Sequence, residues 1–280
     1  MRRHAALLPL LAALTLGASA QPQNQALPPA LREMVDAERA FAARALIVGW
    51  KQSFLEYFSD TATGFGGEPG PAKDLIRKTP DPPRELQLLW EPRFGDIAAS
   101  GELGWLTGPV TSINPARGNM PRFSNYSSVW KREADGTFKV VMDLGTDTPE
   151  FVPYAPGFTR APQAGRYTGN PAGANDSLRT ADAALNTGVM ADQSTAYRGR
   201  IADDGRIHRT NVMPMAGEAA ALPWLAMQKP YPAATTEFAE AARSGDMGYT
   251  WGHVGTSFYT RVWVRGRDAA WQVALDVVLE

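Results

Sequence analysis

The sequence predicts an α+β protein made of two tandem copies of one domain, and two observations carry this prediction. The first is self-similarity: residues 244–277 restate residues 100–144, with S-G-acid-apolar-G-aromatic recurring after 144 residues and Y-x-x-V-W-x-R after 133. The second is element order, because helical periodicity precedes a series of strand patterns. A repeat of this length has the size of a small domain, not of a solenoid repeat.

The match between the two copies is densest in the closing stretch. Seven residues of the first copy recur there after 133 residues, where Tyr126, Val129, Trp130, Arg132, Asp135, Val140 and Asp143 match Tyr259, Val262, Trp263, Arg265, Asp268, Val273 and Asp276. From the first helix to Gly252 the spacing is 144, which aligns Glu38 with Asp182. The spacing changes once, as a loop of different length would cause.

Helical patterns open the first copy. Pro28 and Pro29 suit a helix start, and the apolar residues of 31–46 then fall on one face, which predicts a helix of about 18 residues. Gly49 interrupts this pattern. Trp50 and the aromatic residues that follow at spacings of three and four predict a second helix, ending near residues 59–60.

Strand patterns take over from residue 86. The candidates are 86–90, 97–99, 102–108, 123–132 and 137–144, with turns at 100–101 and 135–136. Helices followed by such a meander predict an antiparallel sheet that wraps one face around the helices. In the second copy, 222–227 reads as an apolar insertion, and 236–243 fits strand or helix equally well.

The ends of the copies divide the chain into four parts. Arg2, Arg3, the apolar run 5–16 and Ala18-Ser19-Ala20 predict a signal peptide, residues 1–20, that is cleaved after Ala20 to give a periplasmic or secreted protein. A membrane anchor would need about 20 apolar residues, so none is expected. The first domain is placed at 27–145, a Pro/Gly-rich linker at 146–177 and the second domain at 178–280.

Composition excludes several classes of function. The chain has no cysteine, so we expect no disulfide, no thiolate chemistry and no metal site of the zinc type. Without its leader it carries 26 basic and 29 acidic residues, which disfavours a nucleic-acid partner. Phosphate loops, dinucleotide fingerprints and nucleophile elbows are absent from the sequence. We therefore expect no cofactor.

Three patterns occur in both copies: S-G-[ED]-[LM]-G-[WY], V-W-x-R and D-[GA]-x-[FW]-x-V-x-x-D. In these patterns the chain resembles the SnoaL-like and ketosteroid-isomerase-like branch of the nuclear transport factor two superfamily. The resemblance covers nearly all of residues 31–144 and, more loosely, 178–277. It implies two cone-shaped domains, each a strongly curved antiparallel sheet wrapped around N-terminal helices, with an apolar cavity open at one end. Members often pair through their sheets, which would let the two copies form an intramolecular pseudo-dimer.

Members of that superfamily include isomerases, epoxide hydrolases, cyclases and dehydratases that use carboxylates, tyrosines or histidines, and many members without known activity. The basic Asp of the steroid isomerases falls here on Gly66 and, in the second copy, on Thr210. Neither side chain can abstract a proton. The resemblance therefore disfavours steroid-isomerase chemistry in both copies.

Large aromatic side chains are the candidate ligand-binding residues. They offer flat apolar surfaces that could grip a small hydrophobic molecule, and the alternative is that they fill the core of a bent sheet. The set comprises Trp90, Trp105, Tyr126, Trp130, Tyr249, Trp251, Tyr259 and Trp263.

Three residues are candidates for catalysis. Asp143 and Asp276, expected at the ends of the last strands, would gain a raised pKa in a dry cavity and act as acid or base; alternatively they cap strand ends or pair with Arg132 and Arg265. His253 could act as a general base in the second copy, or be an ordinary satisfied histidine.

Three functions follow from these readings. The first is a non-catalytic exported protein that binds a small apolar or aromatic ligand in one or both cones. The second is an acid–base enzyme of the isomerase, dehydratase or epoxide hydrolase type acting on a small hydrophobic substrate, with Tyr126 or Tyr259 as hydrogen-bond donor. The third is a scaffold protein of the cell envelope, which an exposed apolar patch would favour.

Overall fold

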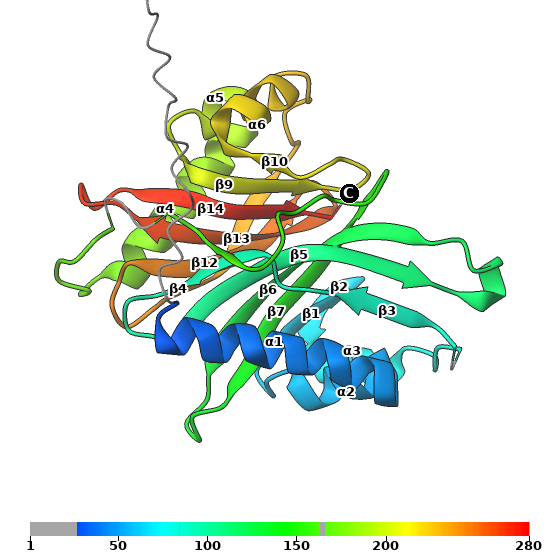
Figure 1. Ribbon diagram of the computed structural model, residues 1–280. Helices are drawn as coiled ribbons and strands as arrows, with labels where there is room; N and C mark the ends of the chain where they lie inside the picture. The colour runs from blue at the N-terminus through cyan, green and yellow to red at the C-terminus, as the bar shows by residue number, and fades with distance from the viewer. Residues whose placement is uncertain (1–26, 84, 163–165, 280) are drawn as a thin grey trace, which may run out of the picture.

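A computed structural model of the protein describes residues 27–83, 85–162 and 166–279. The predicted signal peptide, residues 1–20, lies outside the described residues. Two antiparallel-rich sheets lie face to face, and helices cover the outer side of each (Figure 1). The predicted α+β fold class, with sheets set against helices, is confirmed. No helix among the described residues combines the length and apolarity that crossing a bilayer requires.

The first unit comprises the elements from α1 to β8. Its helices are α1 (Pro29–Val48), α2 (Trp50–Tyr57), α3 (Ala72–Lys78) and the short 3-10 helix η1 (Pro115–Arg117). Its strands are β1 (Thr63–Gly66), β2 (Glu68–Pro71), β3 (Gln87–Trp90), β4 (Phe94–Ile97), β5 (Leu103–Ile113), β6 (Arg122–Arg132), β7 (Phe138–Thr148) and β8 (Thr159–Arg160). The sheet has the order β7-β6-β5-β4-β8, with β3 paired to β5, and β1 and β2 form a separate hairpin.

The predicted helices and strands are present, with two differences in length. Gly49 has a φ of 85°, a left-handed conformation that suits glycine, and separates α1 from α2 as predicted. The strands β5 and β7 extend four or five residues beyond the predicted ends, whereas the predicted strand 97–99 overlaps β4 only at Ile97. These extensions are partly exposed, so the apolar alternation that marks a half-buried strand stops before the strand does.

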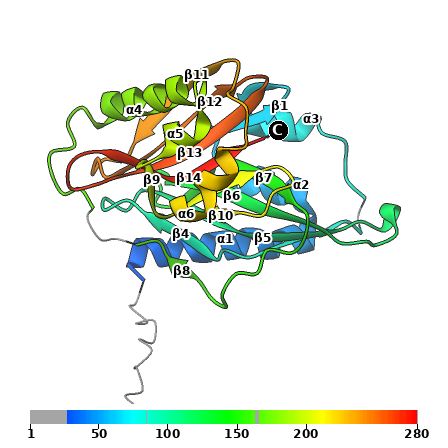
Figure 2. The same ribbon diagram turned by 90° about the horizontal axis from the view of Figure 1, so that it is seen from above.

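The second unit comprises the elements from α4 to β14. Its helices are α4 (Ala174–Val189), α5 (Gln193–Tyr197) and α6 (Gly217–Leu225), and its strands are β9 (Ile201–Arg209), β10 (Met215–Ala216), β11 (Ala234–Ala241), β12 (Met247–Val254), β13 (Ser257–Arg265) and β14 (Trp271–Val278). The sheet order is β10-β9-β14-β13-β12-β11. The undecided segment 236–243 is mostly strand. Figure 2 shows α4 beside β11 and β12, while α1 runs along β5 on the other side of the molecule.

Both sheets carry the same irregularity at the same place in the repeat. The β6–β7 register shifts between Val129 and Trp130, and the β13–β14 register shifts between Val262 and Trp263. A bulge bends its strand and increases the local twist. Because the two bulges are 133 residues apart, the repeated sequence specifies a repeated bend.

A repeated glycine also permits the same close approach in both sheets. A Cβ on Gly108 would collide with the carbonyl oxygen of Glu91, and one on Gly252 would collide with that of Thr235. Each pair is separated by 144 residues from its counterpart. The sheets therefore curve in the same way, through the same residue type.

An apolar core joins the two sheets. It is formed by the sheet faces turned away from the helices and contains Phe94, Ala98, Leu103, Trp105, Val129, Val141, Met142 and Leu144 from the first unit, with Ala242, Met247, Tyr249, Val262, Ala274, Leu275 and Val277 from the second. Burial of so much apolar surface is the main force that holds the units together.

Equivalent residues of the two units contact each other at one edge of this core. Ser100 and Ser244 share a hydrogen bond between their hydroxyls, 2.8 Å long, and each hydroxyl accepts from the other's backbone N–H. Asp246 accepts from the backbone N–H of Ala99, and its counterpart Glu102 accepts from that of Arg243. Such reciprocal contacts are those that a twofold axis produces between identical subunits.

Two arginines fix the segment that connects the units. Arg160 donates from Nε to Asp96 Oδ1 at 2.8 Å, and β8 pairs with β4. Arg166 forms ion pairs with Asp96 and with Asp246, the latter at 2.8 Å. This part of the expected linker is therefore held against both units.

His208 is a buried polar residue between the sheets. It lies on β9, is fully buried, and its Nδ1 is 3.0 Å from the hydroxyl of Ser127 on β6. Burial, followed by the nearby charges of Arg206 and Arg209, lowers the pKa of His208 to about 3. The imidazole is therefore neutral in the folded protein at pH 5, where an unfolded chain would protonate it.

This difference predicts a loss of stability in mild acid. Because the pKa of His208 is lower in the folded state, the unfolded chain takes up a proton as pH falls below about 6.5, at a cost of up to about 1.4 kcal/mol per pH unit. Between pH 7 and pH 5, wild type should therefore lose roughly 2 kcal/mol more of its unfolding free energy than the His208→Asn variant. Urea unfolding at the two pH values measures it, and parallel losses in both proteins would refute the assignment.

Candidate functional site

A carboxylate on the first helix of each unit faces the sheet. In the first unit Glu38, on α1, is fully buried and accepts hydrogen bonds from Trp90 Nε1 at 2.7 Å, Ser128 Oγ at 2.7 Å and Trp130 Nε1 at 2.8 Å. Burial raises the pKa of Glu38, although these three donors oppose the shift. All three donors are neutral, so no cation compensates a charge on this carboxylate.

The sheet register brings a second carboxylate to the same interior. Alternate residues of a strand share a face, so Tyr126, Ser128 and Trp130 all point towards α1. Asp143, on β7, lies directly opposite Ser128 and therefore shares that face. It is half-buried, and burial, followed by the charge of Glu38, raises its pKa well above the ordinary value. Within the described part of the chain, no hydrogen bond or ion pair is formed by its carboxylate.

The hydroxyl of Tyr126 is a buried donor that is not used. It has no hydrogen-bond partner among the described residues, and Tyr126 is only 5% exposed. Gly145 lies directly opposite on β7, and a Cβ placed there would have no atom within 4 Å. The interior face of β7 is thus open along Asp143, Gly145 and Asp147, beside an unsatisfied hydroxyl.

A pocket of about 510 Å³ adjoins the N-terminal end of β6. It is formed where the long β5–β6 hairpin meets β3 and the start of α2, and its lining comprises Trp50, Leu86, Leu88, Ser112, Asn114, Arg117, Met120, Arg122, Phe123, Ser124 and Asp147. We call it the mouth pocket. Ser124 is the residue that precedes Tyr126 on the inner face of β6, so the mouth pocket lies one inner-face position away from Tyr126.

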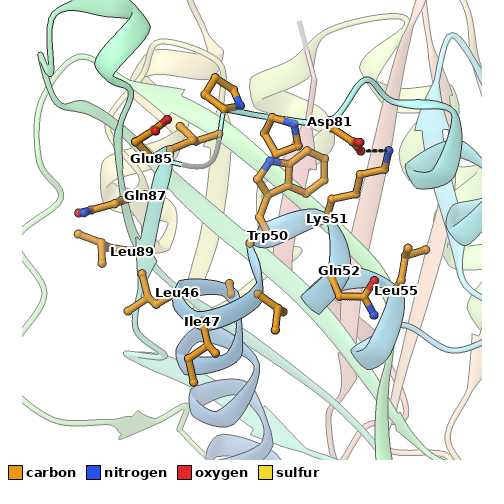
Figure 3. A pocket seen from close by; sticks show the side chains of 16 residues that line it. Leu46, Ile47, Trp50, Lys51, Gln52, Leu55, Asp81, Glu85, Gln87 and Leu89 are labelled. Atoms are coloured by element: carbon orange, nitrogen blue, oxygen red, sulfur yellow. Dashed lines mark hydrogen bonds and ion pairs between the residues drawn. The ribbon is translucent and has the colours of Figure 1, made fainter.

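A second pocket, of about 890 Å³, adjoins the first on the outer side of α1 and α2 and shares Trp50 and Leu86 with it (Figure 3). Its walls are polar and apolar in nearly equal parts, with Leu46 and Ile47 on one side and an ion pair between Lys51 and Asp81, 2.7 Å long, on the other. Leu46 is 55% and Ile47 77% exposed. Among its described residues, this pocket has no buried donor that lacks a partner, which distinguishes it from the interior.

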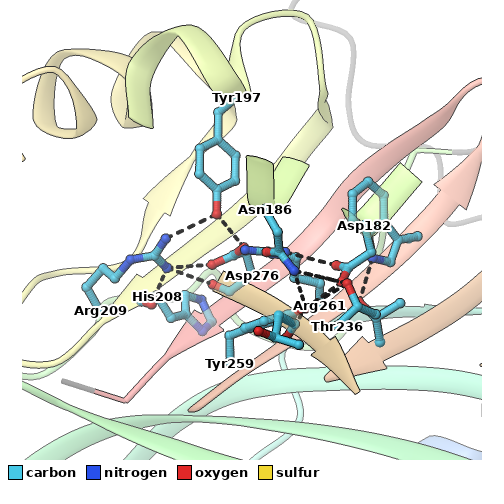
Figure 4. Close-up of polar contacts among 12 residues, drawn as sticks. Asp182, Asn186, Tyr197, His208, Arg209, Thr236, Tyr259, Arg261 and Asp276 are labelled. Carbon is cyan, nitrogen blue, oxygen red and sulfur yellow. Dashed lines mark hydrogen bonds and ion pairs between the residues drawn. The ribbon is translucent and has the colours of Figure 1, made fainter. Parts of the chain in front are cut away.

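The equivalent interior of the second unit is filled by an ionic network (Figure 4). Arg261 on β13 donates from Nη1 to Asp182 on α4 at 2.9 Å and from Nε to Asp276 on β14 at 2.6 Å. Asp276 also accepts from Arg209 at 2.7 Å and from the hydroxyl of Tyr197 at 2.6 Å. All five side chains are fully buried.

Two replacements separate the two interiors. Arg261 stands where the first unit has Ser128, and Val278, fully buried opposite Tyr259, stands where it has Gly145. The hydroxyl of Tyr259 is used, since it donates to Asp182 and accepts from Asn186 Nδ2 at 2.8 Å. The second interior is therefore plugged, whereas the first is open.

The replacement of Ser128 by Arg261 also reverses the direction of the pKa shift in the equivalent aspartates Asp143 and Asp276. Although burial opposes the shift, Arg209 and Arg261 lower the pKa of Asp276. Burial raises the pKa of Asp143, and no arginine among the described residues opposes this shift. The pKa values of these equivalent aspartates therefore shift in opposite directions, and the first unit holds the carboxyl whose neutral form is favoured.

The structure separates the predicted aromatic residues into three groups. Trp90, Tyr126 and Trp130 face the interior of the first unit, and Tyr259 and Trp263 face that of the second. Trp105, Tyr249 and Trp251 lie between the sheets, where they pack in the joint core. These three side chains therefore fill the core between the sheets and do not line either interior, because odd and even residues of a strand face opposite sides.

The three candidate catalytic residues also differ from expectation. Asp143 and Asp276 lie within β7 and β14, not at their ends, because both strands run past them. The partners of Asp276 are Arg261 and Arg209, whereas Arg265 stacks on Tyr167 and, in the first unit, Arg132 pairs with Glu33.

His253 does not face either interior. On β12, Thr250 points towards Asp182, so His253 is on the opposite face. There it forms an ion pair with Glu237, and its ring lies 4.4 Å from that of Phe258. A role as general base in a cavity of the second unit is therefore excluded.

The residues that sequence reasoning missed are Glu38, Ser128, Gly145, Asp182 and Arg261. The alignment of Glu38 with Asp182 at a spacing of 144 was a usable signal, as was the unmatched pair Ser128 and Arg261 within a matched run. Within the described ranges, no three carboxylates, histidines or cysteines gather to hold a metal ion.

Comparisons with known proteins found similarity among solved structures. No family model matches the chain, and no curated protein is similar to it in sequence. In structure the chain is similar to a ketosteroid isomerase-like protein from Erwinia carotovora, at 15% identity and a TM-score of 0.30, covering 41% of this chain and 96% of that one. It is also similar to a type 2 hexachlorocyclohexane dehydrochlorinase, at 20% identity and a TM-score of 0.34, covering 48% and 97%. The site itself rests on the contacts within this chain.

The two equivalent tyrosines provide a matched test of the open and plugged interiors. Tyr126→Phe removes a hydroxyl without a partner and should leave the free energy of unfolding within about 0.5 kcal/mol of wild type, or raise it, whereas Tyr259→Phe should lower it by roughly 1–3 kcal/mol because Asp182 and Asn186 lose a partner. Urea unfolding at pH 7 measures both. An equal loss in the two variants would contradict the assignment.

Proposed function

We propose that the interior of the first unit binds a small, largely apolar molecule that carries a hydrogen-bond acceptor, and that the plugged second unit supports it as the other half of an intramolecular pseudo-dimer. The observation that carries the proposal is the buried, unpartnered hydroxyl of Tyr126, beside the space that Gly145 leaves open. On the basis of residues 1–20 alone, the proposal includes export from the cytoplasm.

The argument from Tyr126 is energetic. A buried hydroxyl without a partner costs about 1–3 kcal/mol. A ligand oxygen that accepts its hydrogen bond would recover this cost, and the same hydroxyl in the second unit is already satisfied by protein groups. A ligand would therefore supply the hydrogen-bond acceptor that the first interior lacks.

The walls of the interior favour an uncharged, apolar body for this ligand. Phe41, Phe54 and Trp90 form an aromatic cluster with ring centroids 4.8 to 6.2 Å apart, behind the polar groups. Burial raises the pKa of Glu38 and of Asp143, which favours their neutral forms. A small number of polar groups among many apolar side chains is the composition usually found in binding sites for small molecules.

Converting the first interior into the second should abolish binding. The double variant Ser128→Arg/Gly145→Val introduces the residues that the second unit has at these positions, which would fill the space beside Tyr126 and place a cation between Glu38 and Asp143. Wild type should be stabilised in a saturable way by one or more apolar ketones or alcohols in a thermal-shift panel. The double variant should bind the same compound at least about tenfold more weakly by calorimetry, a loss of about 1.4 kcal/mol.

Ala184→Arg is the control for the added positive charge, because Ala184 is exposed on α4 of the second unit, away from the first interior. It should keep the affinity of wild type. Flat responses of wild type across a broad panel, or full affinity in a folded double variant, would refute the binding function.

An acid–base enzyme is the second candidate, and the raised pKa of Asp143 close to the Tyr126 hydroxyl favours it. Asp143 would transfer the proton and Tyr126 would stabilise a developing oxyanion. This candidate belongs to the first unit, because Asp276 is engaged in buried ion pairs and His253 lies outside the interior.

Mass spectrometry of the bound compound after incubation separates the two candidates. If the protein is an enzyme, wild type should convert the compound and Asp143→Asn should bind it but convert it at least about 100-fold more slowly, as expected for loss of a general acid or base. An unchanged compound in both samples would leave binding as the function. Conversion at the wild-type rate by the variant would exclude Asp143 as the proton carrier.

A further inference from the structure

We propose that the ligand of the first unit is an amphipathic anion, with its charged end at the mouth pocket on Arg117 and Arg122 and its uncharged, oxygen-bearing end at Tyr126. This inference rests on the proposed binding function and names the chemical class of the ligand. It follows from the distribution of charge between the mouth and the interior.

The mouth pocket combines cations with apolar walls. Arg117 and Arg122 both line it, and neither takes part in an ion pair among the residues that the structure describes. Asp147 is the one acidic side chain in the same lining. Trp50, Leu88 and Phe123 provide the apolar wall, and Phe123 is backed by the ring of Phe151 at 6.0 Å. An arginine presents a planar fork of donors that suits a carboxylate or phosphate group.

The interior has the opposite character. The ionisable groups near Tyr126 are the carboxyls of Glu38, Asp143 and Glu91 and the hydroxyl of Tyr154. Among the described residues, no arginine or lysine pairs with Glu38 or Asp143. A ligand anion placed there would be buried without a positive partner, which is strongly unfavourable. The charged end of an anionic ligand must therefore remain at the mouth, and only an uncharged end can reach Tyr126.

The strand fixes the distance between these two ends. Arg122, Ser124 and Tyr126 are alternate residues of β6 and share its inner face. Four residues of antiparallel strand span about 13 Å. A linear ligand with roughly ten carbon atoms between its anionic and its neutral oxygen group would reach from one end to the other.

The hairpin that carries the arginines is specific to the first unit. Between β5 and β6 the repeat spacing falls from 144 to 133, so the first unit has eleven more residues here than the second. The second unit joins β12 to β13 through a turn at 255–256, and Gly255 occupies the position that corresponds to Arg122. The extension that provides the cations therefore belongs to the unit with the open interior.

Three ten-carbon probes test the two ends separately by isothermal titration calorimetry at pH 7 and low salt. 10-Hydroxydecanoate has both end groups, decanoate lacks the hydroxyl, and 1,10-decanediol lacks the anion. Wild type should bind 10-hydroxydecanoate at least about tenfold more tightly than the diol, a difference of about 1.4 kcal/mol. Arg117→Ala/Arg122→Ala should remove this preference and leave the affinity for the diol unchanged.

The other end is tested with Tyr126→Phe, which should bind 10-hydroxydecanoate no more tightly than decanoate. Arg117→Lys/Arg122→Lys should keep most of the preference for the anion, and Arg179→Ala, which removes an exposed arginine on α4, should keep all of it. These variants separate a local contact at the mouth pocket from a general loss of positive charge on the protein.

The possible outcomes distinguish the failure of this inference from that of the binding function. If the hydroxy acid and the diol bind equally, and both are lost in Ser128→Arg/Gly145→Val, the binding function holds and the anionic class is wrong. A preference for the anion that survives Arg117→Ala/Arg122→Ala would also overturn the inference. If none of the probes and no panel compound binds, both proposals fail.

Discussion

The structure depends on how each unit compensates the carboxylate that its first helix turns towards its sheet. Removing a charge from water is costly, so a buried carboxylate needs donors, a cation or a proton. The second unit supplies a cation, Arg261, and the network around it leaves no room for a ligand. The first unit supplies neutral donors from Trp90, Ser128 and Trp130, and its interior stays open.

The choice of compensation at one position also changes its neighbours. In the second unit Arg261 links Asp182 to Asp276, and Tyr259 completes the set, so the ionisable groups that surround it are engaged with one another. In the first unit serine cannot make this link, and Asp143 and Tyr126 are left without protein partners among the described residues. The replacement of Ser128 by Arg261, together with that of Gly145 by Val278, thus separates the open interior from the filled one within the same framework of strands.

Much of the fold could be predicted from the sequence, because local signals determined it. Proline and Gly49 marked the limits of α1, and the V-W-x-R run placed β6 and β13. The site could be predicted only in part. Trp90, Tyr126 and Trp130 were identified, but composition could not show that Trp105 and Trp251 point between the sheets, since facing depends on register. Glu38 and Ser128 were missed because an ordinary carboxylate and serine gain significance only from burial.

The serine contact between the units has a consequence for how the chain could change over time. In a homodimer every substitution occurs twice, so a residue that blocks one cavity blocks both. Here Ser100 meets its own counterpart, Ser244, across a covalently joined pair. Each half could therefore mutate alone while still shielding the apolar face of the other. With both halves in one chain, the second unit can hold a rigid ionic network while the first keeps an open interior.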